Sequence, residues 1–133
     1  MLVLCLSVFA SQHLAQEETD PTADAIALFE EGQNLHEKGN LRGAIELYTK
    51  ALALIPEFPE AALQKGNAHL SLKEIAEAEA AFRRAVELRE DWSLGLASLG
   101  SLLVQKGEFA EAEPLLSRSI KLDEQNYPAL SAM

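Results

Sequence analysis

The sequence nearly repeats itself every 34 residues, and this period constrains the possible fold more than any other feature of the chain. Seven positions carry the repeat. They are Leu28, Gly32, Gly39, Ala44, Tyr48, Ala51 and Pro56, then Ala62, Gly66, Lys73, Ala78, Phe82, Ala85 and Glu90, then Leu96, Gly100, Gly107, Ala112, Leu116, Ser119 and Glu124. A fixed period of this length indicates a stack of similar supersecondary units, each of which buries its apolar face against the next.

Each repeat is expected to form a pair of helices joined by a tight turn. The expected ranges are 24–38 and 41–54, then 59–72 and 75–89, then 93–106 and 109–122. Gly39 and Gly107 stand in the turns, where a helix C-terminus favours the left-handed backbone conformation. Lys73 takes the same place in the second repeat, at an expected cost of about 1 kcal/mol. Pro114 falls inside the last helix, where it removes one backbone hydrogen bond and is expected to bend the helix.

Several helix starts are marked by residues that suit a cap or a first turn. Asp20 followed by Pro21 fits an N-cap and a first helical position. Pro59 likewise suits a first helical position. Asp91 and Asn126 are expected to cap the helices that follow them.

The spacing of these small and bulky residues resembles the tetratricopeptide repeat, and the match covers residues 25–126. The resemblance implies an all-α fold, a right-handed superhelix of tandem helix-turn-helix repeats. The repeats are expected at about 25–58, 59–92 and 93–126 within a domain 24–133, with 127–133 opening a further helix. Such repeats are generic binding scaffolds, so the resemblance says more about fold than about function.

The formal net charge of -10 is unevenly distributed along the 133 residues. Residues 1–24 carry four acidic residues and no Lys or Arg, while each repeat carries a net charge of only -2. No basic stripe is available to displace counterions from phosphates, so nucleic acid is not expected as a partner. Anionic membrane surfaces are disfavoured for the same reason.

The N-terminal segment reads as a short apolar run followed by an acidic stretch. Residues 1–15 resemble a secretory signal peptide, with small residues near Ala10 and Ala15 and an apolar run too short to span a bilayer. Export to the periplasm or outside the cell is therefore expected, although no Lys or Arg precedes the run. An apolar tail packed on the first repeat, in a cytoplasmic protein, and a lipid anchor at Cys5 are the alternatives. Residues 16–23 are expected to form a disordered acidic linker.

By resemblance to the family, the first helix of each repeat lines a concave groove that binds a protein or peptide partner. The groove residues are expected to be Phe29, Glu30, Gln33, His36, Glu37, Leu63, Gln64, Asn67, Leu70, Leu94, Ser98 and Ser101. The groove is expected to be acidic and aromatic at its N-terminal end, with the carboxylates of Glu30, Glu37 and Glu60, and neutral at its C-terminal end. A peptide or short helix with one basic end and one apolar end suits this gradient. The alternative is that these positions are only solvated surface.

Some tetratricopeptide domains bind acidic C-terminal peptides through a clamp of cationic and amide side chains. The matching positions here are Phe29, Gln33, Gln64, Leu94 and Ser98, and none of them is a cation. A carboxylate ligand would find no charge partner at these positions. The sequence therefore disfavours this kind of ligand.

No catalytic or metal-binding motif is recognisable, so the chain is expected to be a non-enzymatic scaffold without a cofactor, a metal or a small-molecule substrate. His36 is expected on the groove surface and His69 in the core, and no two histidines have the spacing of a metal site. Trp92 is expected to pack between the second and third repeats. A second hypothesis is that the chain is a fragment or accessory segment of a larger repeat protein, with an open end that mediates self-association or docking.

Overall fold

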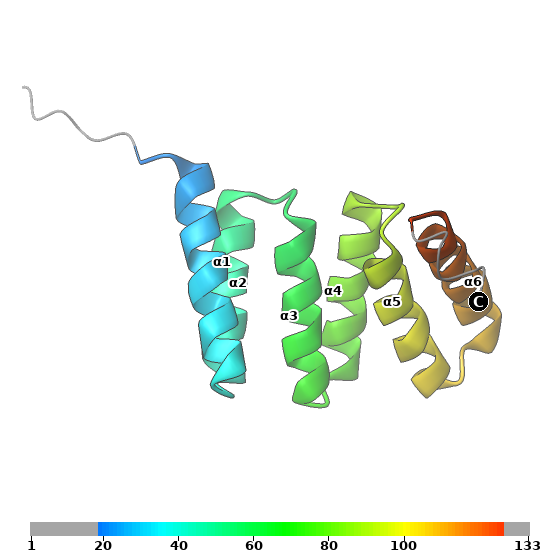
Figure 1. Cartoon of the computed structure of the whole chain (residues 1–133). Coiled ribbons are helices and arrows are strands. Elements are labelled where there is room, and N and C mark those ends of the chain that lie inside the picture. Colours follow the sequence, from blue (N-terminus) through cyan, green and yellow to red (C-terminus); the bar gives the residue numbers. More distant parts are fainter. Residues whose placement is uncertain (1–18, 127–133) are drawn as a thin grey trace, which may run out of the picture.

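The computed structural model describes residues 19–126, which form six helices that pack in chain order as an array (Figure 1). The helices are α1 (Pro21–Glu37), α2 (Leu41–Leu54), α3 (Pro59–Ser71), α4 (Ile75–Leu88), α5 (Ser93–Lys106) and α6 (Phe109–Asn126). No strand occurs in this part of the chain. The all-α repeat fold is therefore confirmed, with each pair of helices forming one of the three 34-residue units.

The turn inside each repeat has the same hydrogen-bonded geometry. The backbone N–H groups of Asn40, Glu74 and Glu108 each donate to a carbonyl five residues earlier, at 2.8, 3.0 and 2.8 Å. This bond is the mark of a helix end that passes through one left-handed residue. Gly39 and Gly107 are that residue in the first and third repeats, at φ of 80° and 81°. Lys73 adopts φ of 63° in the second, so the strained position expected from the sequence is confirmed.

The helix boundaries differ from the expected ones at both ends of the array. α1 begins at Pro21, so residues 21–23 are helical and not part of a linker. The reason is the cap, because the Asp20 carboxylate accepts a hydrogen bond from the Thr22 N–H at 2.9 Å. α6 continues to Asn126, four residues beyond the expected end at residue 122. The expected linker 16–18, the signal peptide and the helix 127–133 lie outside the described residues.

Glycines in the first helix of each repeat let the second helix approach closely. A Cβ on Gly66 would lie 2.5 Å from two ring atoms of Phe82, and a Cβ on Gly32 would lie 2.7 Å from the Tyr48 ring. In the third repeat a Cβ on Gly100 would lie 2.7 Å from Leu116. The three sites are related by the 34-residue period. They show that a glycine at this position leaves room for a bulky side chain of the second helix.

The largest part of the core joins the second and third repeats. It contains the buried residues Ala62, Leu63, Ala78, Phe82, Ala85, Leu99, Leu102, Leu103 and Ala112. Trp92 is part-buried against this cluster, as the sequence predicts, and it is also the N-cap residue of α5 in place of the expected Asp91. The Arg89 guanidinium lies 4.7 Å from the centre of the Trp92 ring. The tryptophan therefore fills the seam between two repeats.

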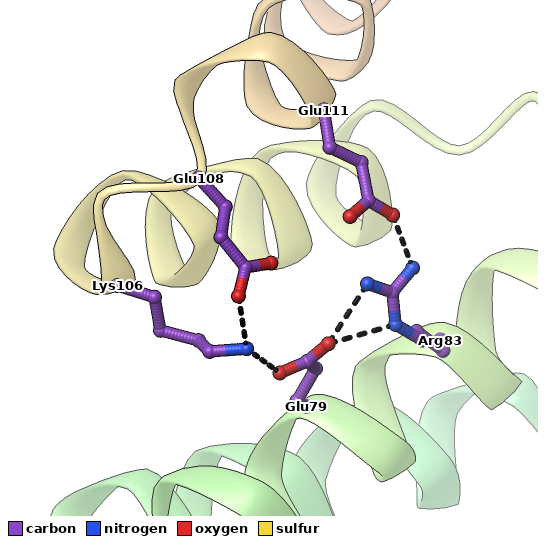
Figure 2. A network of polar contacts seen from close by, with 5 residues as sticks. All are labelled: Glu79, Arg83, Lys106, Glu108 and Glu111. Carbon is purple, nitrogen blue, oxygen red and sulfur yellow. Dashed lines mark hydrogen bonds and ion pairs between the residues drawn. The ribbon is translucent and has the colours of Figure 1, made fainter.

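A network of ion pairs also links the second repeat to the third (Figure 2). Glu79 of α4 accepts hydrogen bonds from Lys106 of α5 at 2.6 Å and from Arg83 at 2.8 Å. Arg83 reaches Glu111 of α6 at 2.5 Å, and Lys106 also pairs with Glu108 at 2.7 Å. The hydrogen bonds from Lys106 and then Arg83 hold the pKa of Glu79 below its usual range. The network therefore joins three helices through one partly buried carboxylate.

Candidate binding groove

Two pockets lie along the side of the array that α1, α3 and α5 line. The first has a volume of about 210 Å³ and is bounded by Gln33, His36, Glu37, Tyr48 and Gln64. The second has a volume of about 270 Å³ and is bounded by Asn67, Leu70, Phe82, Ala97, Ser98, Ser101, Leu102 and Gln105. A shift of 34 residues superimposes Gln33 on Asn67, His36 on Leu70, Tyr48 on Phe82 and Gln64 on Ser98. The two pockets are therefore the same feature of successive repeats.

The first pocket is polar. Its floor is the buried Tyr48, whose hydroxyl lies 3.5 Å from the His36 Nδ1 atom. Burial, with a smaller effect of the nearby Glu37 carboxylate, raises the pKa of Tyr48 to about 12. The hydroxyl therefore stays protonated at neutral pH. The pocket combines one exposed carboxylate with amide and hydroxyl groups, which is a set suited to an ammonium or guanidinium group.

The second pocket replaces most of these polar groups with apolar or small ones. Leu70 stands where His36 stands in the first pocket, and Phe82 replaces Tyr48, so two polar groups are lost. Ser98 and Ser101 contribute hydroxyl groups to the wall of this pocket. No charged residue borders the pocket. An uncharged, largely apolar side chain suits it better than an ion.

Eight of the twelve groove residues predicted from the sequence line these pockets. Four border the first (Gln33, His36, Glu37 and Gln64), and four border the second (Asn67, Leu70, Ser98 and Ser101). Phe29, Glu30 and Leu94 border neither. Phe29 packs in an aromatic group, with its ring centroid 5.0 Å from Phe58 and 5.8 Å from Tyr48. Glu30 on α1 and Leu94 on α5 are both exposed to solvent.

Leu63 does not belong to the groove surface. Its side chain is only 1% exposed and lies in the core that joins the second and third repeats. Residues 63 and 64 differ by about 100° around a helix, so a neighbour of the groove residue Gln64 points inward. The Leu63 side chain also borders neither pocket, so a partner in the groove would not contact it.

The residues that form the pocket floors were not predicted from the sequence. Tyr48 and Phe82 come from the second helices of the first and second repeats, and neither is among the groove residues expected from the sequence. The signal was present, because the same bulky position recurs every 34 residues beside a glycine. The side chain that lies against the glycine also forms the floor of the pocket. This dual role follows only from the assembled geometry.

The acidic end of the groove has fewer unpaired carboxylates than the sequence suggests. Glu60, at the start of α3, pairs with Arg89 of α4. Glu30 and Glu37 are exposed, and neither makes an ion pair within residues 19–126. The charge available to a ligand at this end therefore comes from these two carboxylates.

His69 is confirmed as a core residue, 8% exposed, with its Nδ1 atom 3.1 Å from the Glu74 carboxylate. Among the described residues there is no group of three His, Cys, Asp or Glu side chains that could hold a metal ion. None of the helices in this part of the chain combines the length and the apolar character that crossing a bilayer requires.

Residues 35–102 and residues 95–126 each match a family described as tetratricopeptide repeat. The first match alone covers half of the chain. The chain therefore belongs to the tetratricopeptide repeat family.

Three relatives illustrate the breadth of the family. The chain is 31% identical over 107 residues to the E3 ubiquitin-protein ligase CHIP of Arabidopsis thaliana, a match that covers 80% of this chain and 38% of CHIP. The first tetratricopeptide domain of Spaghetti (RPAP3), solved with the HSP90 peptide SRMEEVD, superimposes with a TM-score of 0.74 at 25% identity, covering 84% of this chain and 88% of that one. The TPR2B domain of yeast Sti1, from a complex with pHsp70, gives 0.75 at 21% identity, covering 83% and 88%. The chain spans between 14% and 38% of the length of the curated relatives that it matches.

Proposed function

We propose that this chain is a non-catalytic protein-interaction scaffold that binds an extended peptide or short helix in the groove lined by α1, α3 and α5. The observation that carries the proposal is the pair of equivalent pockets with different chemistry. The first pocket, with Glu37 and the exposed Glu30 nearby, suits a Lys or Arg side chain of the partner. The second, with Leu70 and Phe82, suits an apolar one. The solved relatives in complex with HSP90 and Hsp70 support peptide binding as the general mode.

The ligand chemistry proposed here differs from that of the Spaghetti complex. The peptide in that complex, SRMEEVD, has three acidic residues. In this chain the five positions that match the cationic clamp are Phe29, Gln33, Gln64, Leu94 and Ser98. Their side chains supply amide, hydroxyl and apolar groups but no positive charge. An acidic peptide would lose its hydration at this surface without gaining a counter-charge.

The test uses two eight-residue probes of identical composition, one with Lys-Arg at its N-terminal end and Leu-Val at its C-terminal end, and one reversed. Fluorescence polarisation should show that the full chain prefers one orientation. Changing Glu30 and Glu37 together to Gln should weaken binding of the preferred probe by about two- to thirtyfold, because exposed ion pairs contribute about 0.2–1 kcal/mol each. Leu70→Ala should weaken both probes, since it removes apolar contact. Equal binding of the two orientations, unchanged in the double variant, would show that the acidic end does not orient a ligand.

A second candidate function is docking through the end of the array, as an accessory segment of a larger assembly. Ile120 on α6 is 58% exposed, whereas its equivalent Val86 is part-buried against the core. Sedimentation at rising concentration should then show self-association of the full chain. Ile120→Glu should abolish it, and Glu113→Gln should not. A monomer throughout the range would reject this candidate.

A further inference from the structure

A third pocket lies on the opposite side of α3 from the groove. It has a volume of about 340 Å³ and lies between α2 and α4, bounded by Leu52, Ala62, Lys65, His69, Glu77, Ala80, Ala81 and Arg84. Ala62, Lys65 and His69 occupy one side of α3, while the groove residues Gln64, Asn67 and Leu70 occupy the other. A ligand in this pocket would therefore leave the groove free.

The pocket has an apolar floor with charged walls. Leu52 and Ala62 contribute apolar surface from α2 and α3, and Ala80 and Ala81 contribute it from α4. The walls contain two cations, Lys65 and Arg84, against one carboxylate, Glu77. This local excess of positive charge occurs in a chain whose formal net charge is -10.

The two cations are poorly matched by internal partners. The other arginines of the described residues form short ion pairs with carboxylates. Arg42, for example, lies 2.8 Å from Glu74. Lys65 is part-buried and makes no ion pair within residues 19–126. Within the same residues, the one ion pair of Arg84 is with Glu87 at 3.5 Å, which is long for an ion pair. Both cations are therefore available to an external carboxylate.

The equivalent pocket of the next repeat shows that the fold does not need these residues. It lies between α4 and α6, has a volume of about 300 Å³ and is bounded by Arg83, Val86, Glu87, Leu99, Glu111, Pro114 and Leu115. Leu99 stands where Lys65 stands, and Leu115 stands where Ala81 stands. Its one cation, Arg83, is already engaged by Glu79 and Glu111. Glu31 replaces Lys65 in the first repeat, so the lysine is not a requirement of the repeat lattice.

From these observations we infer that the pocket between α2 and α4 is a second docking site, for a partner segment that presents an apolar side chain with a carboxylate beside it. The apolar side chain covers Ala62, Ala80 and Ala81, and the carboxylate pairs with Lys65 and Arg84. The inference does not rest on the groove function. If both hold, the scaffold binds partners of opposite charge on its two faces and brings them together.

The experiment compares two tripeptide probes, N-acetyl-Glu-Leu-Glu-amide and N-acetyl-Lys-Leu-Lys-amide, by amide chemical shifts of the full chain at millimolar concentration. The leucine is common to both, so only the charge differs. Non-specific attraction to a chain of this net charge favours the lysine probe. If the pocket is a docking site, the glutamate probe alone should change the amide chemical shifts of Ala62, Lys65 and Ala81. Shifts of groove amides with the lysine probe would report separately on the proposed function.

Two variants copy residues that other repeats already accept. Ala81→Leu reproduces Leu115 and fills the pocket, and Lys65→Glu reproduces Glu31 and reverses the charge. Each should abolish the glutamate-probe shifts, and Arg84→Gln should weaken binding at least threefold. The control Lys121→Gln removes an exposed cation of α6 and should change nothing.

Three results would overturn the inference. They are no shift at these amides with the glutamate probe, equal shifts with the lysine probe, and shifts that survive Lys65→Glu. The dispersion of the amide spectrum shows whether each variant is folded. If Ala81→Leu unfolds the chain, Lys65→Glu still decides the outcome, because the first repeat already has a glutamate at the equivalent position.

Discussion

The second and third repeats share one lattice but are packed differently. In the second, the fully buried Phe82 covers Gly66, and α4 has helical neighbours on both sides. In the third, the part-buried Leu116 covers Gly100, and Ile120 on the same helix is largely exposed. A position in the repeat therefore does not fix how much a side chain contributes to stability. That contribution is set by where the repeat lies in the array, because neighbouring repeats bury the side chain.

The largest difference in unfolding free energy between the two repeats is expected when Phe82 and Leu116 are truncated. Phe82→Ala should lower the free energy of unfolding by about 3–5 kcal/mol, because it leaves a cavity in the main core. Leu116→Ala should cost only about 1–2 kcal/mol, since less of its surface is buried. Urea unfolding of the two variants measures the difference. Equal losses would mean that the outer repeat is as well packed as the central one.

The glycines beneath these side chains should show a smaller contrast. The added Cβ of Gly66→Ala would meet a ring that has no room to move, at an expected cost of about 1–2 kcal/mol after the gain in helix propensity. Gly100→Ala should be close to neutral, because the flexible Leu116 side chain can rotate. Thermal unfolding of the two variants gives the comparison, and a neutral Gly66→Ala would contradict the close approach of α3 and α4.

The ion network provides a contrast that depends on pH. Glu79 has a lowered pKa in the folded state, so its contribution to stability is complete at neutral pH. That contribution should decline as the pH falls below about 5, the range in which an unfolded glutamate begins to take up a proton, and vanish once the folded carboxyl is protonated.

The matched control for this effect is the equivalent residue of the third repeat. Glu79→Gln should lower the midpoint of thermal unfolding at pH 7 and not at pH 3. Glu113→Gln should have little effect at either pH, because Glu113 is exposed and makes no ion pair within the described residues. Identical behaviour of the two variants would mean that the network is electrostatically irrelevant.

The smallest expected effects are at the turns. Lys73→Gly should stabilise the second repeat by about 0.5–1 kcal/mol, because the left-handed conformation is strained for a residue with a Cβ. Gly107→Ala should destabilise the third repeat by a similar amount for the same reason. If both variants melt with the unmodified chain, backbone conformation at the turns does not limit stability.

The sequence predicted the fold because one lattice of small and bulky residues recurs in phase three times. That register also put Gln33, His36 and Gln64 on one side of the array, where they border the first pocket. It failed at Leu63, where one step along the helix moves a side chain from the surface into the core. Membership of the groove therefore depends on helix rotation more finely than on the period of the repeat.

Two features were not predictable from spacing. The pocket between α2 and α4 exists because Ala62, Ala80 and Ala81 leave room, and alanines in such repeats also indicate close helix packing. The ion network joins Glu79 to Lys106, which lie 27 residues apart, and charged residues with this separation have no recognisable pattern. Both depend on tertiary distances that a single sequence does not contain.

Trp92 makes the seam between the second and third repeats visible to spectroscopy. It is the one tryptophan of the chain and is part-buried against the core, with Arg89 over its ring and Gly95 close to it. Intrinsic fluorescence excited at the tryptophan band therefore reports on a single seam, whereas circular dichroism averages over every helix of the chain. An emission shift that precedes the loss of helical signal would mean that the third repeat separates from the second before either one melts.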